Sequence, residues 1–319
     1  MFFRRDAGIL RAAVEGSSVP DKQPVPVIHV GTSGWSYDDW DGRFYPERKE
    51  RGFDRLVYHA RYFDCVEVNS SFYRPPSARA AASWVARTPR NFQFTFKLYR
   101  RFTHERDQPW TADEVDDYRR GIDPVREAGR LGAVLVQFPW SFKADDPAFR
   151  HLETIRRDFG DLPLVVEVRH ASWVSDLALK RIKDNGFGFA NIDQPASRSG
   201  VPPMTLVTSP VGYVRLHGRN REAWFSKDAG RDARYDYLYR EDEIEEWIER
   251  IRDVARQSEK TYVFTNNHYR GQAPANALQI LSKIQGRPVS VPSPLLQTFP
   301  FLEDIVVEGL GPGEQGELF

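Results

Sequence analysis

Acidic, basic and amide side chains recur along the chain, each close to the end of a short run rich in β-branched or aromatic residues. The candidate catalytic residues are Glu67, Glu167, Asp193 and His217. The candidate ligand-binding residues are Ser33, Trp35, Asn69, Tyr73, Lys97, Gln137, Arg169, His170, Arg215, Asn266, Asn267 and His268. Two carboxylates with different pKa values can serve as acid and base, and arginine can hold a phosphate or carboxylate through paired hydrogen bonds. These residue types indicate an enzyme with an anionic ligand.

The same side chains allow two other interpretations. Glu167, Asp193, His217 and His268 supply enough oxygen and nitrogen donors for a divalent metal. The sequence contains no tightly spaced ligand pair such as His-Glu-x-x-His, so the spacing gives no reason to expect a metal, and the cofactor stays unknown. The charged residues could also form a layer of structural ion pairs, although buried ion pairs rarely improve stability by themselves.

Eight strand-like runs carry most of these residues, and segments with helical spacing separate most of them. The runs span residues 27–31, 65–69, 92–97, 133–137, 164–170, 189–193, 213–217 and 262–268. Eight strands alternating with helices predict an α/β protein, a (β/α)8 TIM barrel, as a single domain over residues 27–286. Because the active site of this fold lies at the carboxyl ends of the strands, we expect the polar residues to meet at one mouth.

The alternation of side chains along a strand indicates which residues face inward. Pairs that share a face are Glu67 with Asn69, Glu167 with Arg169, Asn191 with Asp193, and Arg215 with His217. Outward residues of this fold meet apolar helices, where a charge is costly. We therefore predict that all four pairs face the interior.

Helix boundaries can be predicted from capping patterns. Thr111 and Glu114 fit a capping box. Asp146 precedes Pro147, which suggests a cap followed by a proline at the first helical position. An apolar stripe at helical spacing over residues 244–255 predicts a further helix.

Two connections do not fit the repeat. Residues 194–212 contain four prolines and leave little room for a helix, so the barrel helix after the sixth strand should be missing or reduced. Residues 218–240, after the seventh strand, show no clear periodicity, and we expect an excursion over the barrel mouth. Aromatic residues in the loops, with Trp35 and Tyr73 foremost, suggest a flat ligand such as a base or a sugar ring.

The bulk composition limits the classes of function. The chain of 319 residues has 45 Lys and Arg against 45 Asp and Glu, so no overall field attracts nucleic acid or membrane. Its single cysteine, Cys65, cannot form an internal disulfide. The N-terminus has no apolar signal region and no window is long and apolar enough to span a membrane, so we expect a cytoplasmic protein. We expect a flexible lead-in at residues 1–26 and a C-terminal extension with a flexible tail at 287–319.

Seven ordered motifs at the strand ends resemble the DUF72 (YecE-like) family. They are GTSGWSY at 31–37, EVNSSFY at 67–73, FTFK at 94–97, QFP at 137–139, EVRHASW at 167–173, RLHGR at 215–219 and NNH at 266–268. The resemblance covers about residues 28–285 and implies a TIM barrel, but it brings no reaction with it. The barrel of this family is similar to that of the endonuclease IV and xylose isomerase group. The histidine-rich set that holds three metals in that nuclease is not visible in this sequence.

The last five residues, QGELF, resemble the Gln-x-x-Leu-Phe peptide through which bacterial replication and repair proteins bind the sliding clamp. Gln315, Leu318 and Phe319 would be the partner-binding residues, and Gly316 stands where the consensus prefers a hydrophobic residue. A short segment that orders on binding could present two apolar anchors to a groove. Such a contact would place the barrel near DNA.

Three functional hypotheses follow. The first is an enzyme that binds a phosphate-bearing or nucleotide-like ligand, with Glu67 and Glu167 as acid and base and with Arg169, Arg215 and Lys97 around the anion. The second is a carbohydrate-active hydrolase that uses the same two glutamates, which requires an uncharged pocket floor. The third is a non-catalytic nucleic-acid protein tethered to the sliding clamp.

Overall fold

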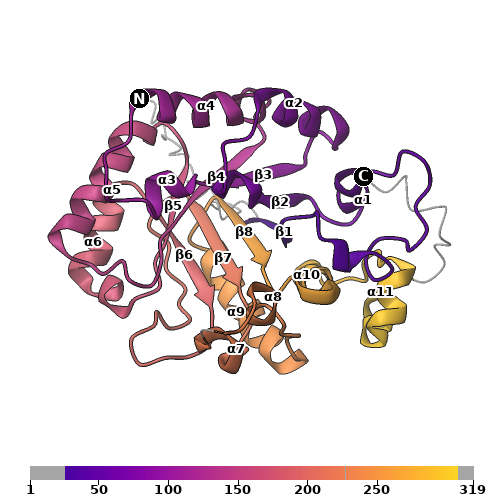
Figure 1. Cartoon of the computed structure of the whole chain (residues 1–319). Helices are drawn as coiled ribbons and strands as arrows, with labels where there is room; N and C mark the ends of the chain where they lie inside the picture. The colour runs from indigo at the N-terminus through magenta and orange to yellow at the C-terminus, as the bar shows by residue number, and fades with distance from the viewer. Residues whose placement is uncertain (1–25, 227, 308–319) are drawn as a thin grey trace, which may run out of the picture.

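The computed structural model describes residues 26–226 and 228–307. Eight parallel strands form a closed barrel in which each strand pairs with its neighbours in sequence and β8 pairs with β1 (Figure 1). The strands are β1 (Val27–Ser33), β2 (Cys65–Val68), β3 (Gln93–Lys97), β4 (Leu131–Gln137), β5 (Leu164–Glu167), β6 (Gly188–Asp193), β7 (Val211–Leu216) and β8 (Lys260–Thr265). The predicted single-domain (β/α)8 TIM barrel is confirmed.

Helices lie between most successive strands and after β8, most of them around the outside of the barrel. They are α1 (Arg55–His59), α2 (Ala78–Arg87), α3 (Arg100–Thr103), α4 (Ala112–Glu127), α5 (Asp146–Phe159), α6 (Asp176–Asp184), α7 (Arg221–Phe225), α8 (Arg231–Arg234), α9 (Glu241–Ala255), α10 (Gln272–Gln285) and α11 (Ser293–Thr298). Short 3-10 turns are η1 (Asp38–Trp40), η2 (Ser70–Phe72), η3 (Ala171–Val174), η4 (Tyr269–Gly271) and η5 (Pro300–Ile305). The apolar residues of the 244–255 stripe are buried, as predicted for α9.

The caps of α4 and α5 explain where these helices begin. Thr111 accepts a hydrogen bond from the Glu114 amide at 3.3 Å, and Glu114 accepts one from the Thr111 amide at 2.7 Å, so the predicted capping box is confirmed. The prediction for Asp146 is wrong by one residue. Asp145 is the cap of α5 and accepts from the Ala148 amide at 2.9 Å, because its extended backbone directs the carboxylate toward the first turn.

Both irregular connections are confirmed in the part of the chain that the structure describes. No helix lies between β6 and β7, where residues 194–210 run as an extended connection with a few turns. After β7 the chain forms α7 and α8 before it reaches α9 (Figure 1). The two short helices lie near the carboxyl end of β7, and Trp224 and Tyr235 of this segment line a cleft there.

The described part of the C-terminal extension packs against the barrel. The Val289 amide donates to the Ile305 carbonyl at 2.8 Å, and Leu295 and Leu302 are fully buried among residues that include Trp40 and Ala273. The tail residues Gln315, Leu318 and Phe319, and the lead-in up to residue 25, lie outside the described residues. None of the helices within residues 26–307 as described is both long and apolar enough to cross a membrane.

Candidate active site

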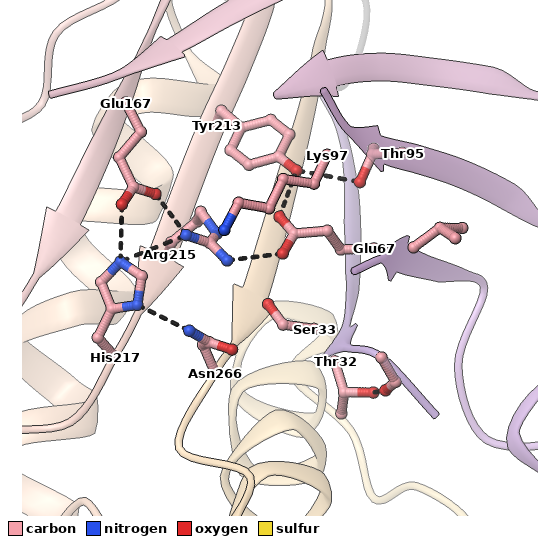
Figure 2. A network of polar contacts seen from close by, with 12 residues as sticks. Thr32, Ser33, Glu67, Thr95, Lys97, Glu167, Tyr213, Arg215, His217 and Asn266 are labelled. Atoms are coloured by element: carbon pink, nitrogen blue, oxygen red, sulfur yellow. Dashed lines mark hydrogen bonds and ion pairs between the residues drawn. The ribbon is translucent and has the colours of Figure 1, made fainter. Parts of the chain in front are cut away.

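Arg215 of β7 occupies the centre of the barrel mouth, between two glutamates from opposite walls (Figure 2). Its Nη2 donates to Oε1 of Glu67 on β2 at 2.6 Å, and its Nη1 donates to Oε2 of Glu167 on β5. All three side chains are buried. Burial by itself lowers the pKa of Arg215, but Glu167 and Glu67 raise the pKa above the ordinary arginine value, so the guanidinium stays charged.

Tyr213 of β7 forms a hydrogen bond with Glu67. The Tyr213 hydroxyl donates to Oε2 of Glu67 at 2.8 Å and lies 3.0 Å from the Thr95 hydroxyl, which must then act as its donor. Burial, followed by the charge of Glu67, holds the pKa of Tyr213 well above its ordinary value, so the phenol keeps its proton. The sequence hypothesis did not include Tyr213, although it shares an alternating face with Arg215 and His217 and could have been found by the same rule.

Glu167 is held by two arginines. Its Oε1 accepts from Nη2 of Arg169 at 2.8 Å and from Nε of Arg169 at 3.1 Å, in addition to the bond from Arg215 to Oε2. Burial by itself raises the pKa of Glu167. The charges of Arg215 and Arg169 outweigh burial and hold the pKa well below the ordinary glutamate value. Glu167 is therefore an ionised carboxylate with no proton to donate near neutral pH.

His217 is a neutral neighbour of this pair. The Asn266 amide nitrogen lies 2.9 Å from Nδ1 of His217, and Nε2 lies 3.4 Å from Oε1 of Glu167. Nε2 also lies 3.4 Å from Nη2 of Arg169 and 3.5 Å from Nη1 of Arg215, so the ring contacts all three charged side chains of this group. Burial, with the nearby arginines, lowers the pKa of His217 to about 3.

Lys97, at the end of β3, is the third basic residue of the cluster. Its Nζ lies 3.9 Å from the centroid of the Phe72 ring, and Figure 2 shows the amine pointing toward Arg215 and Glu67. Among the described residues, Lys97 forms no ion pair with a carboxylate. Burial, together with the positive charge of Arg215, lowers the pKa of Lys97 to about 7.

Above these residues lies a cleft with two lobes. The first lobe has a volume of about 330 Å³ and is lined by Gly34, Trp35, Ser36, Tyr37, Asn69, Ser70, Phe72, Tyr73, Lys97, Gln137, Arg169, Arg215, Tyr235, Asn266 and His268. The second lobe has a volume of about 500 Å³ and is lined by Gln137, Pro139, Trp140, Arg169, Gln194, Ser197, Ser199, Trp224, Arg234 and Tyr235. The lobes meet at Gln137, Arg169 and Tyr235, which line both.

The structure brings most of the predicted residues together. Those that line the first lobe are Trp35, Asn69, Tyr73, Lys97, Gln137, Arg169, Arg215, Asn266 and His268. Glu67, Glu167 and His217 form the buried layer bonded to Arg215, Arg169 and Asn266. Ser33 is also buried, and Figure 2 shows it beside Glu67; its hydroxyl has no hydrogen-bond partner among the described residues.

The predicted inward orientation of Asn191 and Asp193 is wrong. Ile192 is in register with Arg215, so Ile192 faces the interior and its neighbours in sequence face outward. There Asp193 accepts from Nε of Arg219 at 2.8 Å, and Arg219 also bonds Glu243 of α9. The outward charge is tolerated because Arg219 neutralises it, although burial still raises the pKa of Asp193. Asp193 therefore lies apart from the cluster around Arg215.

Two further candidates stabilise loops. The Asn267 amide donates to the Tyr237 carbonyl at 2.7 Å and to Asn276 at 2.8 Å, and these bonds hold the β7–α9 connection against α10. His170 caps η3 by accepting from the Ser172 amide at 3.1 Å. The polar groups of Asn267 and His170 thus form hydrogen bonds within the protein. Their position at the ends of strands in the sequence does not reveal these bonds.

The sequence reasoning missed much of the second lobe. Gln194, Ser197 and Ser199 come from the β6–β7 connection and line the cleft. The sequence indicated only that this connection has no helical pattern. Without a helix on the outside of the barrel, the connection can approach the mouth. The proposed metal ligands Glu167, Asp193, His217 and His268 are not brought together. No group of three or more His, Cys, Asp or Glu in the described ranges could hold a metal ion.

The fold and this ionic mouth define a TIM-barrel protein with a buried glutamate–arginine–glutamate centre. The chain belongs to the DUF72 family, whose model, described as a protein of unknown function, matches residues 29–298. It is 31% identical over 268 residues to the UPF0759 protein YunF of Bacillus subtilis, covering 80% of this chain and 94% of YunF. It is 26% identical over 193 residues to the UPF0759 protein YecE of Escherichia coli, covering 60% of this chain and 63% of YecE. The crystal structure of a DUF72 family protein from Thermotoga maritima matches with a TM-score of 0.73 at 34% identity, covering 81% of this chain and 99% of that one.

Proposed function

We propose that this protein is an enzyme that binds a small anionic molecule, carrying a phosphate or carboxylate, in the cleft at the barrel mouth. The observation that carries the proposal is the arrangement of the basic groups at the cleft. The charges of Arg169 and Arg215 balance those of Glu67 and Glu167, His217 is neutral, and Lys97, with a pKa of about 7, adds a positive charge only when it is protonated. Because Arg169 bonds Glu167 through only two of its nitrogens and lines the cleft, it can donate charge-assisted hydrogen bonds to an anion there.

Arg169 is the cation that is available to the ligand. Its Nε and Nη2 bond Glu167, and its Nη1 has no hydrogen-bond partner within the described residues. The guanidinium lies 5.2 Å from the centroid of the Trp224 ring and lines both lobes. An arginine fixed on one edge presents its remaining N–H groups without further loss of side-chain freedom. Arg215 differs, because both of its terminal nitrogens bond glutamates.

In this proposal Glu67 and Glu167 orient the arginines and do not act as an acid and base pair. Protonation of Glu167 would break bonds to two guanidinium groups, and its low pKa expresses that cost. A charged pocket floor also speaks against the carbohydrate hydrolase hypothesis, which needs two carboxylates with separate pKa values and an uncharged floor. No observation in the described residues favours the clamp-tethered hypothesis.

The second lobe suggests a ligand larger than a bare anion. Trp140 is 48% exposed at this lobe, and Trp224 and Tyr235 border the same space. Exposed aromatic faces next to an anion site suit a nucleotide or another ring-bearing phosphate.

Calorimetric titration tests the proposal. We expect inorganic phosphate and adenosine monophosphate to bind the wild-type protein, the nucleotide more tightly. Arg169→Ala should weaken both by at least tenfold, because it removes a charge-assisted hydrogen bond. Arg150→Ala removes an exposed arginine from α5 and is the matched control for net charge. Equal affinities of Arg169→Ala and Arg150→Ala, or no binding to the wild-type protein, would refute the proposed anion site.

A further inference from the structure

We propose that Lys97 is a nucleophilic amine, which forms an iminium ion with a carbonyl compound that also carries a carboxylate or phosphate. This inference rests on the proposed function, since the anionic group of the ligand would bind beside Arg169. It adds a reaction type, covalent activation of an aldehyde or ketone, and a substrate class to the proposed enzyme.

The first support is the position of Lys97. It ends β3 and lines the first lobe, so its amine can reach a ligand there. Its backbone is fixed, because the Ser71 hydroxyl donates to the Lys97 carbonyl at 2.6 Å and the Leu98 amide donates to the Leu135 carbonyl at 2.9 Å. The amine lies over the face of Phe72, a contact that by itself favours the ammonium form, as the glutamates do.

The second support is that the nearby carboxylates are already used. Glu67 accepts from Arg215 and Tyr213, and Glu167 accepts from Arg215 and Arg169. A lysine that paired with either carboxylate would be held in its ammonium form and could not attack a carbonyl. Here the arginines take the carboxylates and leave the amine unpaired among the described residues.

The third support is the sum of charges that face the amine. Arg215 from β7 and Arg169 after β5 disfavour the ammonium form, and Glu67 from β2 and Glu167 from β5 favour it. His104, which follows α3, packs edge-on against Phe72, and its own low pKa of about 4 leaves it uncharged. Burial and the two arginines prevail, which lowers the pKa of Lys97 to about 7. At pH 7.5 its neutral fraction is therefore roughly several hundred times that of an ordinary lysine.

The chemical step balances with the groups present. The lone pair of Nζ adds to the carbonyl carbon, and the carbonyl π electrons move to oxygen, which receives a proton from the nitrogen. The resulting carbinolamine takes up one proton on its hydroxyl and loses water as the nitrogen lone pair forms the C=N bond. The neutral amine, the carbonyl compound and one proton thus give one iminium ion and one water, with no oxidant or reductant.

Reductive trapping tests the inference. The full-length protein is incubated at pH 7.5 with pyruvate or with dihydroxyacetone phosphate, sodium cyanoborohydride is added, and peptides are analysed by mass spectrometry. We expect one reduced adduct per chain, located on Lys97. Inorganic phosphate should slow its formation by competition, because both anions need Arg169.

Two variants control the experiment. Lys97→Arg keeps a positive charge but has no nucleophilic amine, so the adduct should be lost while the circular dichroism spectrum is retained. Lys143→Arg removes an exposed lysine beside Trp140 and should trap as much adduct as the wild-type protein. If Lys97→Arg does not fold, competitive labelling of the wild-type protein with acetic anhydride between pH 6 and 10 replaces it. Lys97 should then titrate near pH 7, and a titration near 10.5 would overturn the inference.

The outcomes separate this inference from the proposed function. Phosphate binding without any adduct on Lys97 would overturn the inference and leave the anion site standing. An adduct spread over many exposed lysines would also overturn it. If the wild-type protein neither binds phosphate nor traps a carbonyl compound, both proposals fail.

Discussion

Arg215 compensates the negative charges of the two glutamates that are buried in the barrel. Each glutamate is fully buried, and each accepts from one end of the same guanidinium. A buried carboxylate without a cation would lose the interaction that compensates for its desolvation. The three side chains therefore depend on one another. If one of them is removed, the desolvation free energy of the remaining buried charges is no longer compensated.

We predict that Arg215→Met destabilises the protein by about 3–5 kcal/mol, the range typical of breaking a buried ion pair from one side. Urea unfolding at pH 7.5 measures this loss. Arg150→Met, an exposed arginine on α5, should change stability by less than about 0.5 kcal/mol. A loss for Arg215→Met as small as that of the control would show that the glutamates do not depend on Arg215.

His217 predicts a pH dependence of stability. Its pKa is lowered from 6.5 to about 3 in the folded protein, so the unfolded chain binds a proton there at a higher pH than the folded one. The stability that neutral His217 contributes is complete above about pH 6.5 and is lost as the pH falls toward 3. His217→Gln should therefore reduce the difference in unfolding free energy between pH 7.5 and pH 4.5 by roughly 2–3 kcal/mol. An unchanged difference would contradict the assignment of a neutral buried His217.

At the scale of elements, the strands were predictable because each carries its own apolar pattern. All eight lie within a few residues of the sequence-based limits. The orientation of β6 was not predictable by the same rule. Asp193 faces outward because Arg219, 26 residues later in the chain, neutralises it, and alternation along one strand contains no information about a partner on another. The same limit applies to Asn267, whose partner Asn276 lies on α10.

The cap of α5 offers a matched pair of substitutions. Asp145→Ala should destabilise the protein by about 1 kcal/mol, because the Ala148 amide loses its acceptor. Asp146→Ala, one residue further on, removes a first-turn charge and an exposed ion pair with Arg181 at 3.7 Å, and it should cost less, about 0.5 kcal/mol. Thermal unfolding of both variants at equal salt concentration measures the difference. A larger loss for Asp146→Ala would restore Asp146 as the cap.

At the scale of the whole molecule, the described part of the C-terminal extension is expected to unfold together with the barrel. Leu302 is fully buried against it, whereas the adjacent Phe301 is 38% exposed. We predict that Leu302→Ala costs about 2–5 kcal/mol in a single cooperative transition, and that Phe301→Ala costs much less. The circular dichroism of the whole chain and tryptophan fluorescence should report the same midpoint. Two separate transitions would instead make residues after 286 an independent unit.

The whole-molecule arrangement shows how the proposed anion site is compatible with a chain of zero net charge. The overall balance of 45 basic and 45 acidic residues does not show where these residues lie, and the barrel places Lys97, Arg169 and Arg215 along the first lobe of the cleft. The sequence located this mouth through the strand ends. The sequence could not show that both glutamates form ion pairs with Arg215, because those contacts join β2, β5 and β7 across the barrel.

The most direct test of the anion site is a crystal structure of the protein soaked in sodium tungstate, with the anion located by its anomalous signal. We predict a peak in the first lobe, within hydrogen-bonding distance of Arg169 Nη1 and the Lys97 amine. The peak should disappear in Arg169→Ala crystals of the same form. Tungstate bound elsewhere on the protein, with the first lobe empty, would refute the proposed anion site.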